Sequence, residues 1–391
     1  MARLFATGAF TGFGPNSLDP GASPAAPHRV QAQRPGGLRS RVRLECPRRP
    51  GVYGMVDGDG ELIYVGKAKC LRTRLLSYFR RKSRDPKAAK ILEGTRGLVW
   101  EYAPSEFAAL LRELELIRRW QPRFNVKNQP RRQRRVYVCL GRQPAPYVFL
   151  TARPAASAFA CFGPVPASRM APEAVRRLND AFRLRDCPRS QEMIFAEQQE
   201  LFPMPRAAGC VRYEIGSCLG PCAAACTHAA YAEQVRAVRA FLEGADAELL
   251  NSLERAMAEA AAALAFERAA ALRDRLAPLR WLHDHLERLR LARERYSFIY
   301  PVDGHAGNDL WYLIHEGRVQ AVTPAPCDEP SRQAAARHVE RVYQPGPLRR
   351  QPLSPGEADG VLLVAAWFRK HPQELDRVLP PAEARLRCQR P

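Results

Sequence analysis

The sequence lacks any long uninterrupted run of apolar residues. No stretch of its 391 residues approaches the roughly 18 consecutive apolar residues that a membrane-spanning helix needs. Residues 1–20 hold a short apolar patch that glycine and threonine interrupt, with a single arginine among them, and they match a secretory signal poorly. We therefore expect no membrane partner and a cytoplasmic location.

Acidic residues are scarce relative to basic ones. The chain has 61 Lys plus Arg against 40 Asp plus Glu, which gives a formal net charge of +21. Lysine and arginine that neutralise phosphates release condensed counterions, so this excess favours a nucleic-acid partner. A proteome rich in alanine, arginine and proline would produce a similar composition, and composition alone leaves the partner open.

An internal repeat is also absent, and the length predicts two or three domains. Residues 1–45 are rich in Pro, Gly, Ala and Arg without periodicity, so we expect a disordered leader there. The fold class that we expect is α+β. The remaining predicted parts are a compact domain at 46–129, a strand pair with a cysteine-bearing connector at 130–227, a helical region at 228–295 and an α+β region of unknown role at 296–391.

The sequence of the compact domain at 46–129 predicts a short mixed sheet with flanking helices. Two short strands at 52–56 and 62–65 are joined by Asp-Gly-Asp-Gly, a sequence typical of a hairpin turn. The other predicted elements are a helix at 70–81, a strand at 97–103, and a helix that begins after Ser105 and ends before Pro122.

Later segments predict further strands and a long helical stretch. Two strands are expected at 134–140 and 146–152. Apolar residues at helical spacing predict two antiparallel helices within 228–295. The last hundred residues predict two strands, at 296–302 and 309–317, followed by two helices.

Two tyrosines flank the turn of the hairpin, Tyr53 in Gly-Val-Tyr and Tyr64 in Tyr-Val-Gly. Cross-strand packing of two aromatic rings would explain them without any chemistry. Phosphodiester hydrolysis, however, needs a base and positive charge near the phosphate oxygens. A tyrosine with its ordinary pKa near 10 becomes a base only where adjacent cations favour the phenolate. Lys67 follows Tyr64 closely and Arg74 lies at the edge of an apolar helix face, as a phenolic base would require.

The segments at 51–53, 64–79 and 110–126 together resemble the GIY-YIG nuclease domain, in the form found in the UvrC/Cho family of nucleotide excision repair proteins. The resemblance implies a DNA endonuclease that cuts on the 3′ side of a lesion. It also implies roles for individual residues: Tyr64 as the base with Tyr53 beside it, Arg74 on the phosphate, Glu113 as the ligand of one Mg²⁺ or Mn²⁺, and Lys67, Tyr78 and Asn125 at or near the site.

Two features bear on how this site is placed. Glu115 lies two residues from Glu113 and faces the other side of the helix, but the register before the segment at 116–126 favours Glu113.

Residues 67–90 carry ten Lys or Arg and one acidic residue, and residues 118–135 carry eight Lys or Arg and no acidic residue. Solvated helix faces usually mix both signs, so we expect these runs to follow DNA, with a plain solvated surface as the alternative.

Four cysteines, Cys187, Cys210, Cys218 and Cys222, lie in one segment of the connector. Four thiolates can hold a zinc ion or an iron-sulfur cluster, but paired Cys-x-x-Cys knuckles typical of zinc are missing. The segment also resembles the UvrC/Cho family, of which several members carry a four-iron four-sulfur cluster on matching cysteines. A cluster, a zinc ion and no metal all remain open, and Cys226 lies outside the matched four.

Residues 248–279 resemble the UVR motif, a helical hairpin through which the family docks on the helicase subunit UvrB. A two-helix hairpin buries too little surface to be a domain, so its apolar residues must meet another surface. The alternative is packing against the chain's own C-terminal region. The resemblance covers residues 46–295. A full-length family member continues into an RNase H-like nuclease and helix-hairpin-helix modules, so we expect a short form that makes one incision.

The resulting hypothesis is a structure-selective, metal-dependent DNA endonuclease of excision repair that a UvrB-like subunit recruits to damaged duplex. Two alternatives remain. A mobile-element GIY-YIG endonuclease would share the domain at 46–129 but would carry a sequence-reading module in place of the cysteine and hairpin segments. An adaptor would bind UvrB and DNA without cutting.

Overall fold

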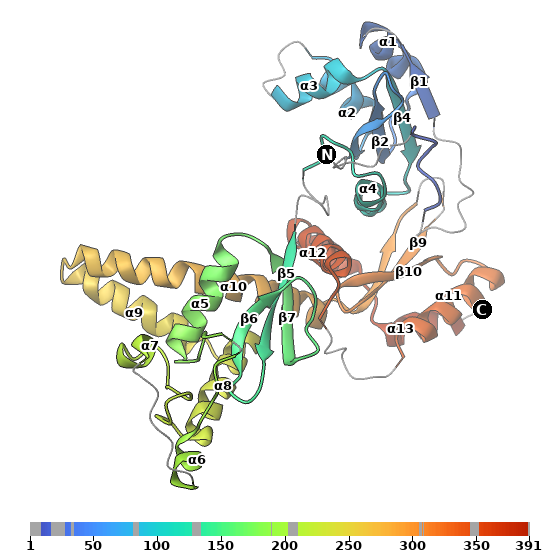
Figure 1. Cartoon of the computed structure of the whole chain (residues 1–391). Coiled ribbons are helices and arrows are strands. Elements are labelled where there is room, and N and C mark those ends of the chain that lie inside the picture. The colour runs from blue at the N-terminus through green and yellow to red at the C-terminus, as the bar shows by residue number, and fades with distance from the viewer. Residues whose placement is uncertain are drawn as a thin grey trace. The chain divides into compact units, whose positions relative to one another are not determined.

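The computed structural model describes the chain in these ranges: 9–16, 28–32, 35–80, 86–126, 134–188, 190–201, 210–304, 307, 309–344 and 352–389. The chain divides into two compact units. The first unit comprises residues 1–133, 292–348 and 359–391, and the second comprises residues 134–291 and 349–358. Each combines helices with small antiparallel sheets, which confirms the predicted α+β class (Figure 1).

The first unit contains a four-stranded antiparallel sheet in the order β1-β4-β2-β3. Its strands are β1 (His28–Gln31), β2 (Gly51–Val56), β3 (Leu62–Ala68) and β4 (Gly97–Tyr102). The predicted hairpin of β2 and β3 is confirmed. In its turn, Asp57 Oδ1 accepts hydrogen bonds from the backbone N–H groups of Asp59 (3.1 Å) and Glu61 (2.9 Å). Such local bonds are the reason that aspartate favours turns.

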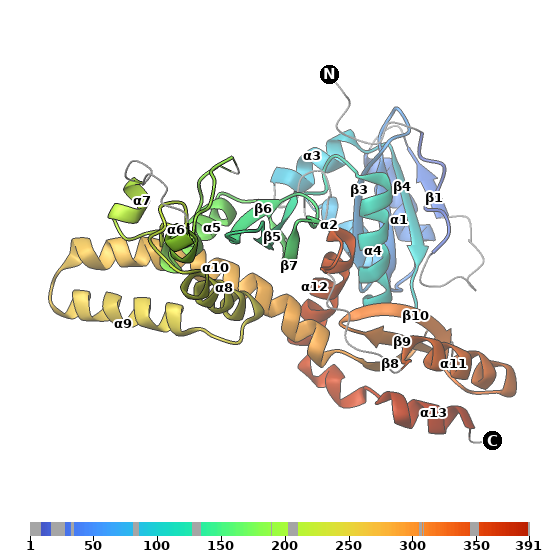
Figure 2. The same cartoon turned by 60° about the horizontal axis from the view of Figure 1, so that its bottom comes forward.

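Helices cover both faces of this sheet. They are α1 (Pro35–Glu45), α2 (Leu71–Tyr78), α3 (Pro86–Gly94) and α4 (Glu106–Trp120). Side chains of α1, α2 and α3 share a core with Tyr53 and Met55, whereas α4 packs on the opposite face, against Val52 and Val65 (Figure 2). The predicted cap is confirmed, because Ser105 Oγ accepts the N–H of Ala108 at 3.1 Å.

The prediction of a disordered leader at 1–45 is wrong for the described residues. Strand β1 pairs with β4 and extends the sheet by one strand. Leu38 and Val42 of α1 are fully buried, and Phe10 and Phe13 pack in the core beneath α4. The composition of this segment did not reveal its order, because its few apolar residues are buried only against residues much later in the sequence.

The C-terminal part of the first unit is a three-stranded sheet with helices. The strands follow the order β10-β9-β8. They are β8 (Phe298–Val302), β9 (Leu310–His315) and β10 (Arg318–Pro324), followed by α11 (Glu329–Val342), α12 (Pro355–Lys370), the 3₁₀ helix η2 (Pro372–Arg377) and α13 (Pro381–Gln389). Two of the three strands were expected, and β10 was not.

This part shares a hydrophobic core with α4. Phe107 of α4 is 1% exposed, and its ring centroid lies 5.2 Å from those of Tyr300 and Tyr312 and 5.3 Å from that of Trp367. Arg118 of α4 also forms an ion pair with Asp359 at 2.9 Å. The region expected to stand alone at 296–391 is therefore built largely into the same unit as the four-stranded sheet.

The second unit begins with a three-stranded antiparallel sheet in the order β6-β5-β7. Its strands are β5 (Arg135–Gly141), β6 (Tyr147–Thr151) and β7 (Ala158–Pro166), and the helices that follow are α5 (Met170–Ala181), α6 (Ala196–Leu201), α7 (Val211–Glu214) and α8 (His228–Glu243). The two expected strands are present. Strand β7 was not expected, and it lies in the part of 130–227 that was expected to be a connector.

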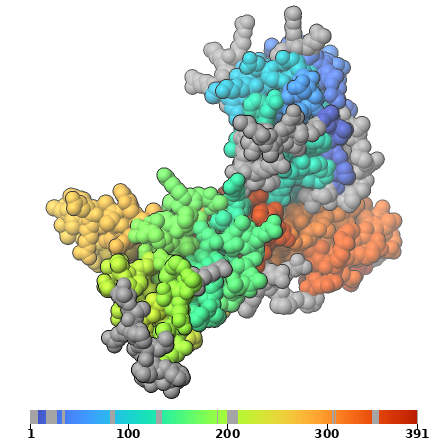
Figure 3. Space-filling view, in the orientation of Figure 1, coloured from blue at the N-terminus to red at the C-terminus, as the bar shows by residue number. Residues whose placement is uncertain are grey.

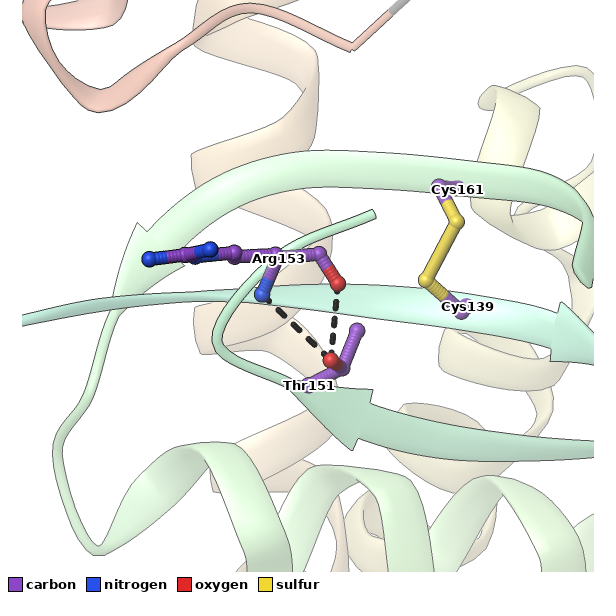
Figure 4. Close-up of a disulfide and its surroundings, with 4 residues drawn as sticks. All are labelled: Cys139, Thr151, Arg153 and Cys161. Atoms are coloured by element: carbon purple, nitrogen blue, oxygen red, sulfur yellow. Dashed lines mark hydrogen bonds between the residues drawn. A yellow bond between two sulfur atoms is a disulfide. The ribbon is translucent and has the colours of Figure 1, made fainter. Parts of the chain in front are cut away.

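A disulfide joins Cys139 of β5 to Cys161 of β7, which lie directly opposite each other (Figure 4). Beside it, the Thr151 hydroxyl donates to the Arg153 carbonyl at 2.7 Å and closes the end of β6. Neither cysteine belongs to the four that were expected to bind a metal. Strand register brings together these two residues, which lie 22 positions apart in the sequence.

The predicted helical hairpin is confirmed as α9 (Glu248–Ala262) and α10 (Phe266–Arg295). Part of its apolar surface packs within the second unit, where Leu249, Leu253 and Met257 contact the core that contains β5 and β6. Among the described residues, every helix is too short or too polar to cross a lipid bilayer.

Candidate active site

Tyr53 and Tyr64 lie on the same face of the β2–β3 hairpin. Tyr53 pairs in register with Gly66, and Met55 pairs with Tyr64, so the alternation of side chains along β2 places both tyrosines together. Their ring centroids are 6.2 Å apart. A Cβ atom at Gly66 would lie 2.5 Å from the Tyr53 hydroxyl, which is too close for any side chain. The glycine of the second tripeptide therefore makes room for the tyrosine of the first.

Helix α2 brings Arg74 and Tyr78 to this pair. The Tyr78 hydroxyl lies 2.9 Å from the Tyr53 hydroxyl, and Arg74 Nε donates to the same Tyr53 oxygen at 3.2 Å. The Arg74 guanidinium also lies 5.2 Å from the centre of the Tyr78 ring. Arg74 is thus held by two tyrosines beside Tyr64, as the resemblance implied for a residue that contacts phosphate.

Tyr64, Arg74 and Tyr78 border a hollow of about 210 Å³. Lys87 and Ala88 of α3 contribute to its wall together with Ser77 of α2. None of the three had been singled out from the sequence. Lys87 falls within the basic run at 67–90, and this run was the one signal that could have indicated it.

The Tyr64 phenol is neutral in this structure. Burial raises its pKa well above the ordinary value, the neighbouring Tyr78 and Glu113 raise it further, and Arg74 lowers it less than these raise it. Arg74 favours the phenolate, as expected of an adjacent cation, but its effect on the Tyr64 pKa is smaller than that of burial. Lys67 does not supply the missing charge, because its Nζ pairs with Glu106 Oε1 at 2.6 Å.

Glu113 lies against the outer edge of β3. The backbone N–H of Lys67 donates to Glu113 Oε1 at 3.2 Å, and the carboxylate is close enough to influence the Tyr64 pKa. Glu115 is engaged elsewhere: its carboxylate pairs with Arg112 at 2.8 Å and with Arg119 at 3.0 Å. Glu113 therefore lies beside β3 near Tyr64, whereas Glu115 pairs with two arginines of its own helix.

Asn125 takes a positioning role on the same edge strand. Its Oδ1 accepts the Val65 N–H at 2.9 Å, and its Nδ2 donates to the Val65 carbonyl at 2.9 Å. The Phe124 N–H donates to the Ile63 carbonyl at 3.0 Å. An exposed edge strand would otherwise leave these groups unpaired. Glu113 and the segment after α4 thus fasten α4 to β3 at the site.

The four candidate cysteines of the second unit lie near one another. Burial raises the pKa of Cys218, and Cys222 and Cys210 raise it further. The pKa of Cys222 is likewise raised by burial first, and then by Cys187 and Cys210. Cys226 adds a fifth thiol, whose pKa is raised to about 11 by burial first and then by Cys218, Glu197 and Cys222.

The cysteine sulfurs are more widely spaced than a closed zinc site requires. Tetrahedral ligands with Zn–S bonds of about 2.3 Å lie about 3.8 Å from one another. Within the described ranges, no three of these sulfurs all lie within 4.8 Å of one another.

The second of the two basic runs carries less free charge than expected. Arg118 pairs with Asp359 (2.9 Å), Arg119 with Glu115 (3.0 Å) and Arg123 with Asp57 (3.0 Å). Residues 127–133 of this run lie outside the described residues. The expectation of a DNA track along 118–135 is therefore weakened for its first three arginines.

Comparisons with known proteins match three consecutive parts of the chain to one family. A model of the UvrC-like GIY-YIG domain matches residues 49–126, one of the UvrC/Cho excinuclease middle domain matches residues 135–241, and one of the UvrB/uvrC motif matches residues 247–280. The relatives include UvrABC system protein C of Pseudomonas putida, which is 37% identical over 244 residues, and that of Pseudomonas entomophila, which is 36% identical over 244 residues. Each alignment covers 61% of this chain and 37% of the relative.

A solved structure is similar over the first domain. The GIY-YIG N-terminal endonuclease domain of UvrC from Thermotoga maritima, bound to magnesium as its catalytic divalent cation, is 35% identical, with a TM-score of 0.21. The match covers 23% of this chain and 96% of that one. Three consecutive parts of one family thus occur here in a single chain, and Tyr64, Arg74 and Tyr78 border one hollow. The chain belongs to the UvrC/Cho family of GIY-YIG proteins.

Proposed function

We propose that the protein is a metal-dependent DNA endonuclease of nucleotide excision repair, which hydrolyses a phosphodiester on the 3′ side of a lesion in the cytoplasm. The observation that carries this proposal is that Tyr64 of β3 and Arg74 of α2 border one polar hollow. Glu113 of α4 lies beside β3, where it accepts the Lys67 N–H and is close enough to Tyr64 to raise its pKa. A cation, a phenol and a carboxylate are the groups that phosphodiester hydrolysis uses.

Each side chain has a distinct task in this proposal. Arg74 binds a nonbridging phosphate oxygen, and its bond to Tyr53 keeps it oriented. The neutral Tyr64 hydroxyl holds the attacking water by a hydrogen bond, since burial disfavours its phenolate. Tyr78 forms part of the wall of the hollow, and its hydroxyl contact with the buried Tyr53 holds it in place.

Glu113 fits the ligand expected for Mg²⁺ or Mn²⁺. Its carboxylate offers hard oxygen donors, and Mg²⁺ in proteins often uses one or two carboxylates together with substrate phosphates. A bound divalent cation would stabilise the negative charge of the transition state and activate water. The protein's own contribution is to hold the carboxylate still, through the bond from the Lys67 N–H and the packing of α4.

A partner surface is supported by the tip of the α9–α10 hairpin. Leu264 is 72% exposed and Phe266 is 66% exposed, while Leu249, Leu253 and Met257 pack within the second unit. Two large apolar side chains at one exposed tip favour docking on another protein. We infer that a UvrB-like helicase subunit binds there. This surface is not expected of a mobile-element endonuclease.

The cysteines are proposed as the donor set of a four-iron four-sulfur cluster. Cys187, Cys210, Cys218 and Cys222 lie close enough to influence one another and offer only sulfur donors, as such a cluster requires. Their role would be to tie the connector together, because the thiolates become ligands only in the folded chain. Iron analysis of protein purified without oxygen tests this assignment.

Nicking of duplex DNA by active-site variants tests the proposed function. We expect Glu113→Gln and Arg74→Ala to lose at least about 100-fold in nicking rate, while duplex binding falls much less, because both groups act mainly on the transition state. Glu115→Gln is the matched control, two residues away on α4. Undiminished nicking by Glu113→Gln would reject the site, and binding without any nicking by the wild-type protein would favour the adaptor.

A further inference from the structure

Helix α1 lies outside the segment at 49–126 that matches the family's nuclease domain, yet it is fastened to α2. Leu38 and Val42 of α1 share a core with Leu71 and Leu75 of α2. The chain after α1 also supplies acceptors for the first turn of α2. For example, the Arg49 carbonyl accepts a hydrogen bond from the Leu71 N–H at 2.9 Å. Because α2 carries Arg74, α1 is structurally coupled to the site.

The faces of α1 are distinguishable from its contacts. Leu38 and Val42 face the core. Arg41 lies on one flank, where it donates to the Gln31 carbonyl of β1 at 3.3 Å and pairs with Glu45 at 2.9 Å. Helical spacing puts Arg39 and Arg43, one turn apart, on the opposite flank. Since β1 is the sheet edge farthest from β3, this opposite flank is directed toward α2.

The surface formed by α1 and α2 carries almost only positive charge. The described residues in 28–49 and 66–80 include eleven Lys or Arg and one acid, Glu45, which Arg41 already neutralises. Arg39 and Arg43 are exposed, and they have no ion pair with any described residue. Figure 3 shows the residues of α1 to α3, in blue and cyan, as outer surface of this unit.

We propose that α1 and α2 form a phosphate-binding platform, on which Arg39 and Arg43 contact the backbone of duplex DNA next to the phosphate that is cut. This inference rests on the proposed function for the identity of the polyanion. A solvated helix face normally mixes charges of both signs, as α11 does with Glu329, Arg332 and Glu340. A phosphate backbone is the partner that a single-signed arginine flank beside a phosphodiesterase site fits best.

Salt dependence of DNA binding tests the platform directly. Anisotropy of a labelled undamaged duplex is measured with Glu113→Gln protein, so that cutting does not interfere. Adding Arg39→Ala and Arg43→Ala should lower the slope of log K against log salt by between one and two, because each lost phosphate contact contributes about 0.9. Affinity near physiological salt should fall by about tenfold. Adding Arg39→Lys and Arg43→Lys instead should restore most of the slope.

The matched control is Arg341→Ala with Arg387→Ala, which removes the same charge from exposed positions on α11 and α13. We expect this pair to change the slope by less than half as much. An equal change in both double variants, or none in either, would overturn the platform. A double Arg39 and Arg43 variant that loses affinity for polyglutamate but keeps its affinity for duplex would also overturn it, in favour of an acidic protein partner. Because binding is read without cutting, a wild-type protein that never nicks would refute the proposed function and leave the platform standing.

Discussion

At the residue scale, the hollow depends on side chains that fix one another. Gly66 lacks a side chain where Tyr53 needs the space, and Tyr53 in turn accepts the hydrogen bond of Arg74. Removing any of the three would displace the others. The placement of Tyr53 and Tyr64 on one face could be predicted from the sequence. In a hairpin with a short turn, the turn fixes which residues of the two strands face each other.

The neutral state of Tyr64 leads to a prediction about pH. Burial and its neighbours hold the Tyr64 pKa above the ordinary value near 10, so the phenol should titrate only above that pH. Ultraviolet titration of the wild-type protein without metal, minus that of Tyr64→Phe, should show no phenolate below pH 10. The folded state binds this proton more tightly than the unfolded chain does, so this stabilising contribution is lost as pH rises above about 10. A difference titration centred below pH 9 would contradict the account.

Other residues of the site could not be placed from the sequence. Lys67 was expected to supply charge to Tyr64, but its ammonium pairs with Glu106, 39 residues away. Asn125 was expected near the chemistry, but it binds both backbone groups of Val65. The partners of Lys67 and Asn125 both depend on where α4 crosses the edge of β3. This tertiary contact cannot be predicted from the spacing of residues along the sequence.

At the element scale, α4 connects the nuclease sheet to the β8–β10 sheet through Phe107. We predict that Phe107→Ala costs about 3 to 5 kcal/mol of unfolding free energy, because a fully buried ring among three aromatic neighbours leaves a cavity. Denaturant unfolding measures this loss, with Phe159→Ala, a 50% exposed phenylalanine on β7, as the matched control. A loss below about 1 kcal/mol at Phe107 would show that the shared core contributes little.

The hairpin supplies a second prediction at this scale. Leu264→Ser with Phe266→Ser should abolish co-purification with a UvrB-like protein while leaving thermal stability nearly unchanged, since both side chains are exposed at the tip. Leu253→Ser serves as the contrast, because that residue packs within the second unit and should lower stability. Retained co-purification of the tip variant would place the docking surface elsewhere.

Elements with strong local patterns were predicted well, and elements completed by distant partners were not. Helix α4 has a serine cap and a clear apolar face, and the β2–β3 hairpin has an explicit turn. Strand β1 has four residues of which one is buried, so only its pairing with β4 defines it. Strand β10 likewise has little apolar periodicity and takes its place from β9.

At the scale of the whole molecule, the sequence predicted the succession of parts better than their grouping. Nuclease, connector and hairpin occur in the expected order. The C-terminal residues were expected as a separate region, yet most of them belong to the first unit, because Phe107 and its aromatic neighbours lie almost two hundred residues apart or more. Contacts of such long range leave no local signal in the pattern of either segment.

The incision of lesion-bearing duplex tests the central claim most directly. The substrate is a labelled duplex with one bulky adduct, incubated with Mg²⁺ and the wild-type protein, with and without a UvrB-like helicase subunit. Cleavage positions are then read on a sequencing gel. The account predicts a single nick on the 3′ side of the adduct that requires both the metal and the partner, and that Glu113→Gln abolishes. Nicks at a fixed base sequence regardless of the adduct, or no nick under any of these conditions, would contradict it.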